Sequence, residues 1–129
     1  MESTRSGDVV SQAALLWRLI HRFVHDAWKL FPDFNIVRHE DLSLNPLPGF
    51  KTLYESLGLD FDERVKNTIL NSSSSENPAR LARNKTYSVK LDSRASLDNW
   101  KQILTPQEVT RIRKITESVS HLFYSDSEW

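Results

Sequence analysis

The sequence predicts a mostly helical α/β domain with about one short core strand and four to five helices. Apolar residues recur three or four positions apart in several segments, which is the spacing of a helix that buries one face. One short apolar run, residues 34–37, follows a proline and has the length of a strand. A chain of 129 residues suits one domain, with residues 1–9 as a mobile polar segment and residues 10–129 as the folded part.

The first expected helix covers residues 10–31. Its apolar stripe is wider than a single helix face, so we expect this helix to be buried on more than one side. Pro32 stops the helix, because proline lacks the backbone N–H that a helix requires. The stripe comprises Ala13, Leu16, Trp17, Ile20, Val24, Ala27, Trp28 and Phe31, widened by Leu15, Leu19 and Phe23.

Residues 34–37 predict a core strand, and the charged residues 38–41 follow it directly. A lone buried strand would leave backbone groups unpaired at about 1 to 3 kcal/mol each, so its neighbours should come from another chain or from an upstream part of a larger α/β protein. The charged residues allow two interpretations. Arg38 could pair with Glu40 or Asp41 in a turn, or the cluster could bind a ligand, since ligands of open α/β sheets bind beyond the carboxyl ends of strands.

Two further amphipathic helices follow. The first begins at Pro46 and ends before Gly58, which stands where a left-handed C-cap is expected. Asp62 is expected to cap the second helix, whose apolar positions run to Leu70. Residues 71–75, an asparagine and four serines, are expected to end helical structure.

Residues 76–94 show little periodicity and carry several cations, which predicts a long basic loop. A helical segment that includes Trp100 is expected shortly after the loop. The sequence Thr105-Pro106-Gln107-Glu108 is a capping box with proline at the first helical position, and it predicts a last helix to about Phe123. The cations of the loop are Arg80, Arg83, Lys85, Lys90 and Arg94.

The composition argues against several classes of function. Lysine plus arginine and aspartate plus glutamate number 17 each, so we expect neither a nucleic-acid nor a membrane partner. The absence of cysteine, of an apolar run near ~18 residues and of an apolar leader predicts a cytoplasmic protein. No phosphate-binding glycine loop or GxSxG turn occurs. His21 and His25 lie four apart without a third ligand pattern, so no metal site is expected.

Two polar clusters could bind a ligand, and each has an ordinary structural alternative. The serines 72–75 could hold the polar edge of a ligand, or they could form a flexible linker. At residues 94–96, a guanidinium, a hydroxyl and helix-end amides could together meet a phosphate. The alternative is an ordinary N-cap by Ser96 or Asp98, with Arg94 in solvent.

Taken in order, these segments resemble the carboxyl-terminal half of sulfotransferases that use 3′-phosphoadenosine 5′-phosphosulfate (PAPS). That family has a strand ending in an Arg-Tyr-Glu-Asp-Leu-like motif, a proline-started helix closing on Leu-Gly-Leu, a hydroxyl-rich adenine contact, and a basic loop before a Trp-Lys helix. The similarity runs from about Ala14 onward. It rests on Val37-Arg38-His39-Glu40-Asp41-Leu42, Asn45-Pro46, Leu57-Gly58-Leu59, Ser72 to Ser75 with Asn77-Pro78, Arg94, and Asn99-Trp100-Lys101.

The resemblance implies the carboxyl-terminal portion of a P-loop-like sulfotransferase fold that contacts PAPS as co-substrate. His39 stands where the family usually has a tyrosine, the serines stand near the adenine contacts, and residues 94–96 resemble the segment at the 3′-phosphate. The Arg-Lys-Gly of cytosolic members is not reproduced at that segment. The implied nucleotide contacts are His39, Ser72, Ser73, Ser74, Arg94, Ala95 and Ser96.

The resemblance also implies what the chain lacks. The family's Lys-Ser-Gly-Thr-Thr-like loop for the 5′-phosphosulfate, its catalytic histidine or glutamate and its Arg/Ser pair have no counterpart here, so no catalytic residue is assigned. We therefore expect a sulfotransferase-family protein, for sulfuryl transfer from PAPS to an acceptor hydroxyl or amine, that is incomplete and inactive alone. A missing amino-terminal half or a partner chain would complete it. The alternative is a non-catalytic helical interaction or scaffold module derived from that fold.

Overall fold

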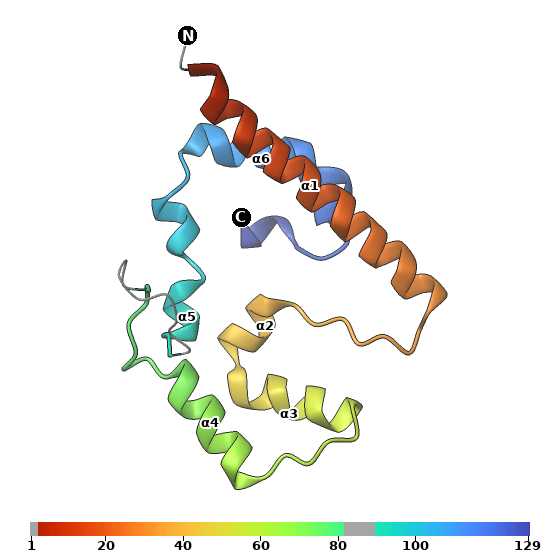
Figure 1. Cartoon of the computed structure of the whole chain (residues 1–129), viewed down its shortest axis with the longest axis vertical. Coiled ribbons are helices and arrows are strands. Elements are labelled where there is room, and N and C mark those ends of the chain that lie inside the picture. Colours follow the sequence, from red (N-terminus) through yellow and green to blue (C-terminus); the bar gives the residue numbers. More distant parts are fainter. Residues whose placement is uncertain (1–2, 82–89) are drawn as a thin grey trace. The chain divides into compact units, whose positions relative to one another are not determined.

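In the computed structural model, residues 3–81 and 90–129 are described (Figure 1). Over these two ranges the chain is mostly helical, as predicted, and it forms no strand. The helices in chain order are α1 (Ser3–Leu30), α2 (His39–Leu44), α3 (Pro46–Ser56), α4 (Glu63–Ser73), α5 (Ser93–Ser96), the 3₁₀ turn η1 (Asn99–Gln102), α6 (Pro106–Ser120) and the 3₁₀ turn η2 (Asp126–Glu128). None of the described helices combines the length and apolar character needed to cross a bilayer.

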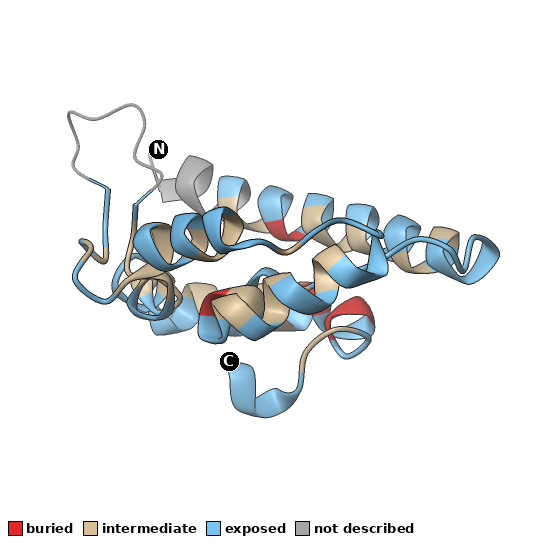
Figure 2. Cartoon of the chain, turned by 90° about the horizontal axis from the view of Figure 1, so that it is seen from below, coloured by how far each residue is buried: buried red, intermediate tan, exposed pale blue. Residues whose placement is uncertain are grey.

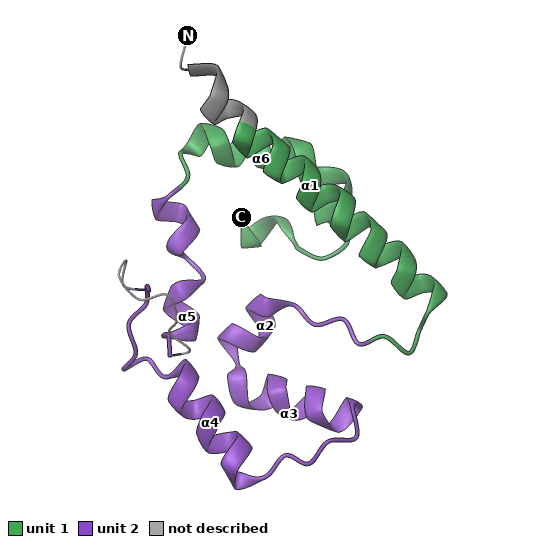
Figure 3. Cartoon of the chain, in the orientation of Figure 1, with its two compact units in different colours: residues 1–34, 104–129 green, residues 35–103 purple. Residues whose placement is uncertain are grey.

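The chain divides into two units (Figure 3). Unit 1 comprises residues 1–34 and 104–129, and it therefore contains α1, α6 and η2. Unit 2 comprises residues 35–103 and contains the shorter helices α2 to α5 with η1. Each unit holds its own tertiary contacts.

In unit 1, α1 packs against α6. Ala14 of α1 and Val119 of α6 are buried, with exposed fractions of 5% and 2%. Polar bonding joins the same two helices, because the Arg18 guanidinium donates to the carbonyl oxygen of Ile115 at 3.0 Å. The small side chain of Ala14 suits a close helix crossing.

The start of α6 confirms the predicted capping box. Thr105 is the N-cap, its Oγ1 lies 3.3 Å from the Glu108 backbone nitrogen, and the Glu108 carboxylate accepts from the Thr105 amide at 2.7 Å. Two of the amides that a helix start leaves without intrahelical partners are thereby satisfied. The helix ends at Ser120, slightly before the predicted Phe123.

The face of α1 that does not meet α6 is apolar and exposed. Leu16 and Leu19 are each 59% exposed and Phe23 is 74% exposed (Figure 2). The expectation that this helix is buried on more than one side is therefore wrong for the described part of the chain. A soluble protein rarely exposes a contiguous apolar patch of this kind unless another surface covers it.

The predicted strand at residues 34–37 is also not formed. The segment leads into α2 without regular structure, and Ile36 and Val37 are 37% and 49% exposed. Asn35, Ile36 and Val37 make no hydrogen bond to any other described residue. A strand exists only through pairing with a neighbour, and the described residues supply no neighbour.

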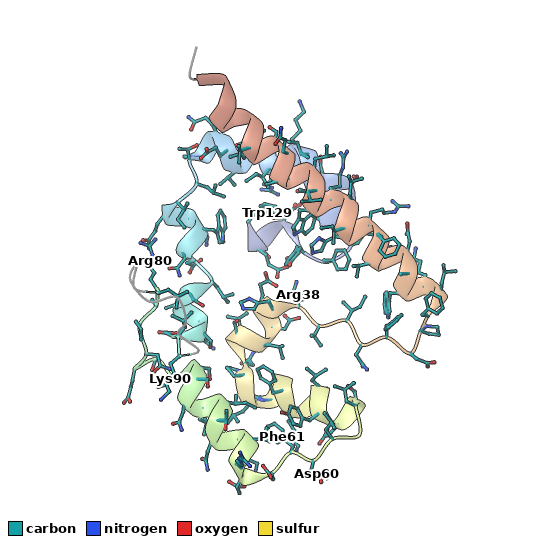
Figure 4. All side chains as sticks on the ribbon, in the orientation of Figure 1. Arg38, Asp60, Phe61, Arg80, Lys90 and Trp129 are labelled. Atoms are coloured by element: carbon teal, nitrogen blue, oxygen red, sulfur yellow. The ribbon has the colours of Figure 1, made fainter. Side chains whose placement is uncertain are left out.

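Unit 2 begins with α2 and α3, which meet closely. A Cβ atom placed on Gly49 of α3 would lie 3.0 Å from the Leu42 side chain of α2. As predicted, α3 is followed by a glycine in the left-handed conformation, Gly58, with φ of +66°. Tyr54 and Phe61 then pack edge to face, with ring centroids 5.5 Å apart, across the turn to α4. Phe61 is labelled in Figure 4.

The helix α4 starts as predicted and ends later than predicted. The Asp62 carboxylate caps it by accepting from the Val65 amide at 2.8 Å. The helix continues to Ser73, so the first part of the serine run is helical rather than a breaker. The Ser73 hydroxyl donates to the Ile69 carbonyl at 2.7 Å, which accommodates a serine inside a helix.

Of the predicted basic loop, residues 76–81 and 90–92 are irregular, whereas its last two residues, 93 and 94, begin the helix α5. Its cations Arg83 and Lys85 lie outside the described residues. Instead of one helix containing Trp100, the chain forms α5 and then η1. Asn99 joins η1 to the loop, because its side-chain amide donates to the Ala79 carbonyl at 2.8 Å.

Candidate functional site

An open pocket of about 840 Å³ lies in unit 2 between the carboxyl ends of α2 and α4 and the short helix α5. Its volume falls within the range of about 300 to 1,000 Å³ that is common for ligand sites. We call it the Arg94 pocket. Its polar lining includes Ser43, Asn45, Ser73, Ser74, Ser75 and Arg94, together with Asp92, Asp98, Asn71 and Ser93.

Four consecutive residues, 91–94, are held from several directions, and the last three of them line this pocket. Each of the four donates a hydrogen bond to a backbone carbonyl from an earlier part of unit 2. The bonds run from Leu91 N to Ser72 O (3.1 Å), Asp92 N to Pro78 O (3.1 Å), Ser93 Oγ to Ser43 O (2.7 Å) and Arg94 Nη2 to Leu44 O (2.9 Å). The stretch thus joins the end of α2 to the end of α4.

The acidic side chains around the pocket already have partners, whereas the Arg94 guanidinium has donors left for a ligand. The Asp92 carboxylate accepts from the Ala95 amide at 2.9 Å, and the Asp98 carboxylate lies 2.7 Å from the Lys101 ammonium. Within residues 3–81 and 90–129, the Arg94 guanidinium bonds only to the neutral Leu44 carbonyl and to no carboxylate. A guanidinium has five N–H donors, so Arg94 keeps donors and a positive charge for an anionic ligand.

The structure brings part of the predicted site together. Ser73, Ser74, Arg94 and Ala95 all line the Arg94 pocket, although the serines and Arg94 lie some twenty residues apart in sequence. The Ser74 hydroxyl accepts from the Glu76 amide at 3.1 Å and ends α4 as its C-cap residue. The linker interpretation of the serine run is therefore wrong for its first three serines, which lie in or at the end of a helix.

The other three predicted contacts are not in the pocket lining. Ser72 contributes its backbone carbonyl to Leu91, and the Ser96 hydroxyl donates to the Ser93 carbonyl at 2.9 Å. His39 is the first residue of α2, and its Nε2 lies 3.4 Å from the hydroxyl of Ser43, which does line the pocket. His39 therefore does not line the pocket itself, but it contacts Ser43, a residue that does.

The expected helix-end amides are not available to a phosphate. Asp92 is the N-cap of α5, and its carboxylate already occupies the Ala95 amide. Asp98, one of the two expected caps, is the N-cap residue of η1, the turn that contains Trp100, but its side chain makes no capping hydrogen bond there. The helix has only four residues, so it has little dipole to offer. Any anion in this pocket must therefore be held mainly by Arg94 and by hydroxyls.

For the charged cluster 38–41, the structure agrees with the first of the two interpretations, in which Arg38 pairs with a neighbouring carboxylate. Arg38 makes a two-point ion pair with Asp41, with nitrogen–oxygen distances of 2.9 and 2.7 Å, at the start of α2 (Figure 4). The hydrogen bonds from Arg38 hold the pKa of the Asp41 carboxyl below its usual value, more than burial raises it. These two side chains therefore order α2, which in turn presents Ser43 and Leu44.

The two histidines of α1 lie in aromatic packing. His21 stacks on Trp17 with ring centroids 3.9 Å apart, and both His21 and His25 meet the ring of Phe123 edge to face. The His21 Nδ1 lies 2.8 Å from the Trp17 carbonyl, so it carries the proton of this hydrogen bond. No group of three candidate metal ligands occurs among the described residues.

Several lining residues were missed from the sequence. Ser43 and Asn45 lie shortly before Pro46, where a helix was predicted to begin, but the helix α2 that ends beside them was not predicted. Asp92 and Asp98 flank the predicted segment 94–96. Their roles as a cap and as a lysine partner depend on where α5 begins, which the sequence pattern did not fix.

Comparisons with known proteins agree with the resemblance found in the sequence. The family model of the sulfotransferase domain matches residues 6–124. Carbohydrate sulfotransferase 1 of Danio rerio is 31% identical over 86 residues, which is 67% of this chain and 20% of that protein. The matched region thus spans about one fifth of the length of this curated relative. No solved structure matches the chain.

Proposed function

This chain belongs to the sulfotransferase domain family, and we propose that its Arg94 pocket binds the nucleotide end of a PAPS-type sulfuryl donor. The observation that carries the proposal is the meeting of Arg94 with Ser73 and Ser74 in one pocket, where the nearby carboxylates are already engaged. Charge-assisted bonds from a guanidinium to phosphate are among the strongest polar contacts that proteins make. The hydroxyls suit the uncharged polar edges of a nucleoside.

The fit to the donor is partial, and it defines the role of each group. Arg94 would hold a phosphate, the serine hydroxyls would face the adenosine, and His39 would act at most through Ser43. No Lys-Ser-Gly-Thr-Thr-like loop for the transferring sulfuryl group occurs in the sequence, and no residue is assigned as its base. These residues would therefore bind and orient the nucleotide, and would not touch the reacting sulfur.

Bound donor would supply the sulfuryl group itself. In the transfer, an acceptor hydroxyl forms a new bond to sulfur while the sulfur–oxygen bond to the nucleotide breaks, and the acceptor proton passes to a base. Negative charge grows on the departing nucleotide oxygen, so cationic groups on the nucleotide side favour the reaction. The relative's name, carbohydrate sulfotransferase, makes a sugar hydroxyl the first acceptor to test.

We also propose that the chain is completed by a sheet-bearing polypeptide that carries the 5′-phosphosulfate loop and the base. Two observations support this. The extended residues Asn35, Ile36 and Val37 have no hydrogen-bond partner among the described residues, and the outer face of α1 exposes large apolar side chains such as Phe23. A strand and a helix face of this kind are the parts that pack onto a neighbouring sheet in an α/β fold.

The test is a calorimetric titration of the purified chain with 3′-phosphoadenosine 5′-phosphate. Binding is expected, and Arg94→Ala should weaken it by about 1.5 to 3 kcal/mol, the scale of a hydrogen bond to a charged group. The matched control is Arg64→Ala, because Arg64 is an exposed arginine of α4 in the same unit that does not line the pocket. Absence of binding would reject the nucleotide site and favour the non-catalytic interaction module.

A further inference from the structure

Arg94 lies on α5, which is too short to fix the position of its side chain. Other contacts must therefore hold Arg94 at the pocket. The helix α5 has four residues, and the chain before it, residues 90–92, is irregular. An arginine side chain on such a segment would lose much rotamer freedom on binding a ligand. The contacts of the neighbouring residue, Ser93, supply the missing constraint.

Ser93 attaches this segment to the carboxyl end of α2. Its hydroxyl donates to the Ser43 carbonyl at 2.7 Å across fifty positions of sequence, and the next residue, Arg94, donates to the next carbonyl, that of Leu44, at 2.9 Å. Two consecutive side chains thus meet two consecutive carbonyls. The last carbonyls of a helix lack intrahelical partners, so the end of α2 presents these acceptors without loss of its own bonding.

The acceptor side of this contact is more deeply buried than the donor side, since Ser43 is buried and Arg94 is exposed. Ser43 is 6% exposed, and α2 is ordered by the Arg38–Asp41 ion pair. A guanidinium that is held on one edge by a fixed carbonyl keeps its plane while the remaining N–H groups stay available. The geometry therefore separates two tasks: Ser93 fixes the backbone of the segment, and Arg94 offers charge.

We propose that Ser93 is a positioning residue for the anion site, acting through Arg94 by fastening residues 91–94 to the end of α2. The ligand-binding consequence rests on the proposed nucleotide function, while the fastening itself does not. The Ser93 hydroxyl is committed to Ser43 and so contributes to affinity by preorganising Arg94 rather than by a contact of its own. Ser93→Thr keeps the hydroxyl and should retain the effect.

The binding test is a double-mutant cycle titrated with 3′-phosphoadenosine 5′-phosphate. Ser93→Ala is expected to weaken binding about two- to tenfold, the scale of one net hydrogen bond, when Arg94 is present. In the Arg94→Ala background the same change should have less than about a twofold effect, because the group that Ser93 positions is gone. Equal losses in both backgrounds would overturn the positioning role.

A ligand-free measurement separates this inference from the proposed function. Amide hydrogen exchange of residues 91–97 should be faster in Ser93→Ala than in the unmodified chain, and should return to the original rate in Ser93→Thr. Ser56→Ala is the matched control, since the Ser56 hydroxyl also donates to a backbone carbonyl of unit 2, that of Leu53 at 2.8 Å, away from the pocket.

The outcomes are distinct. Unchanged exchange in Ser93→Ala overturns the fastening whatever the nucleotide does. Faster exchange together with no nucleotide binding to the unmodified chain supports the fastening and rejects the nucleotide function. Circular dichroism of each variant confirms that helix content is retained, so that a loss of binding is read as a local effect.

Discussion

Replacing Thr105 by alanine tests whether the capping box stabilises the α1–α6 pair. The threonine hydroxyl lies 3.3 Å from the Glu108 amide and donates to the Glu108 carboxylate at 2.9 Å, and alanine removes both contacts. Loss of such a cap costs about 1 kcal/mol of unfolding free energy. For a chain of this size the corresponding fall in melting temperature is about 3 to 5 °C.

The assay is thermal unfolding followed by far-UV circular dichroism, with Thr110→Ala as the control. Thr110 lies in the same helix, but its hydroxyl donates to the Pro106 carbonyl at 2.9 Å within the helix itself. Alanine there should be neutral or slightly stabilising, because it has the higher helix propensity. If both variants melt equally low, the loss reflects threonine content rather than capping, and the argument fails.

The same contact predicts a dependence on pH. Hydrogen bonds from the Thr105 amide and hydroxyl lower the pKa of the Glu108 carboxyl in the folded chain. The ionised Glu108 carboxylate therefore contributes its full stabilisation of the fold above its unfolded pKa, and this contribution is lost as the pH falls through its lower, folded pKa. The difference between Thr105→Ala and the unmodified chain should shrink over that interval, and a difference that grows instead would contradict the assignment of the cap.

Two further predictions concern unit 2 and the whole chain. The Arg38 hydrogen bonds lower the pKa of Asp41, so part of the stability is lost as the pH falls through the folded pKa of this carboxyl. Asp41→Asn should make that loss smaller, as measured by urea unfolding at neutral and at acidic pH. An unchanged pH profile would argue against the ion pair. The isolated chain, incubated with PAPS and a sugar acceptor, should form no sulfated product, because its sequence contains no Lys-Ser-Gly-Thr-Thr-like loop for the 5′-phosphosulfate. Sulfated product above the blank would refute this.

The local signals in the sequence predicted helices well. The capping box at Thr105, the aspartate at residue 62 and the glycine at residue 58 act within a few residues of themselves, and each appears in the structure as expected. These features depend on backbone groups that are close in sequence, so each short segment contains all the hydrogen-bond partners that it needs.

The predictions that failed depended on partners far away. The strand at residues 34–37 needs a neighbouring strand, and the second buried face of α1 needs a covering surface; neither is present among the described residues. In the site, the sequence pattern predicted one helix that includes Trp100, and it did not predict the separate helix α5 or its cap Asp92. Such choices follow from tertiary contacts, here the bonds that hold residues 91–94.

The uncovered side of α1 has a consequence for the life of the chain in a cell. Exposed leucine and phenylalanine side chains are what chaperones and quality-control proteases bind on immature proteins, and they also promote self-association at high concentration. The steady-state amount of this polypeptide should therefore follow the supply of whatever covers that helix. If the proposed partner covers this helix, synthesis of the chain without that partner should give faster turnover or more aggregation.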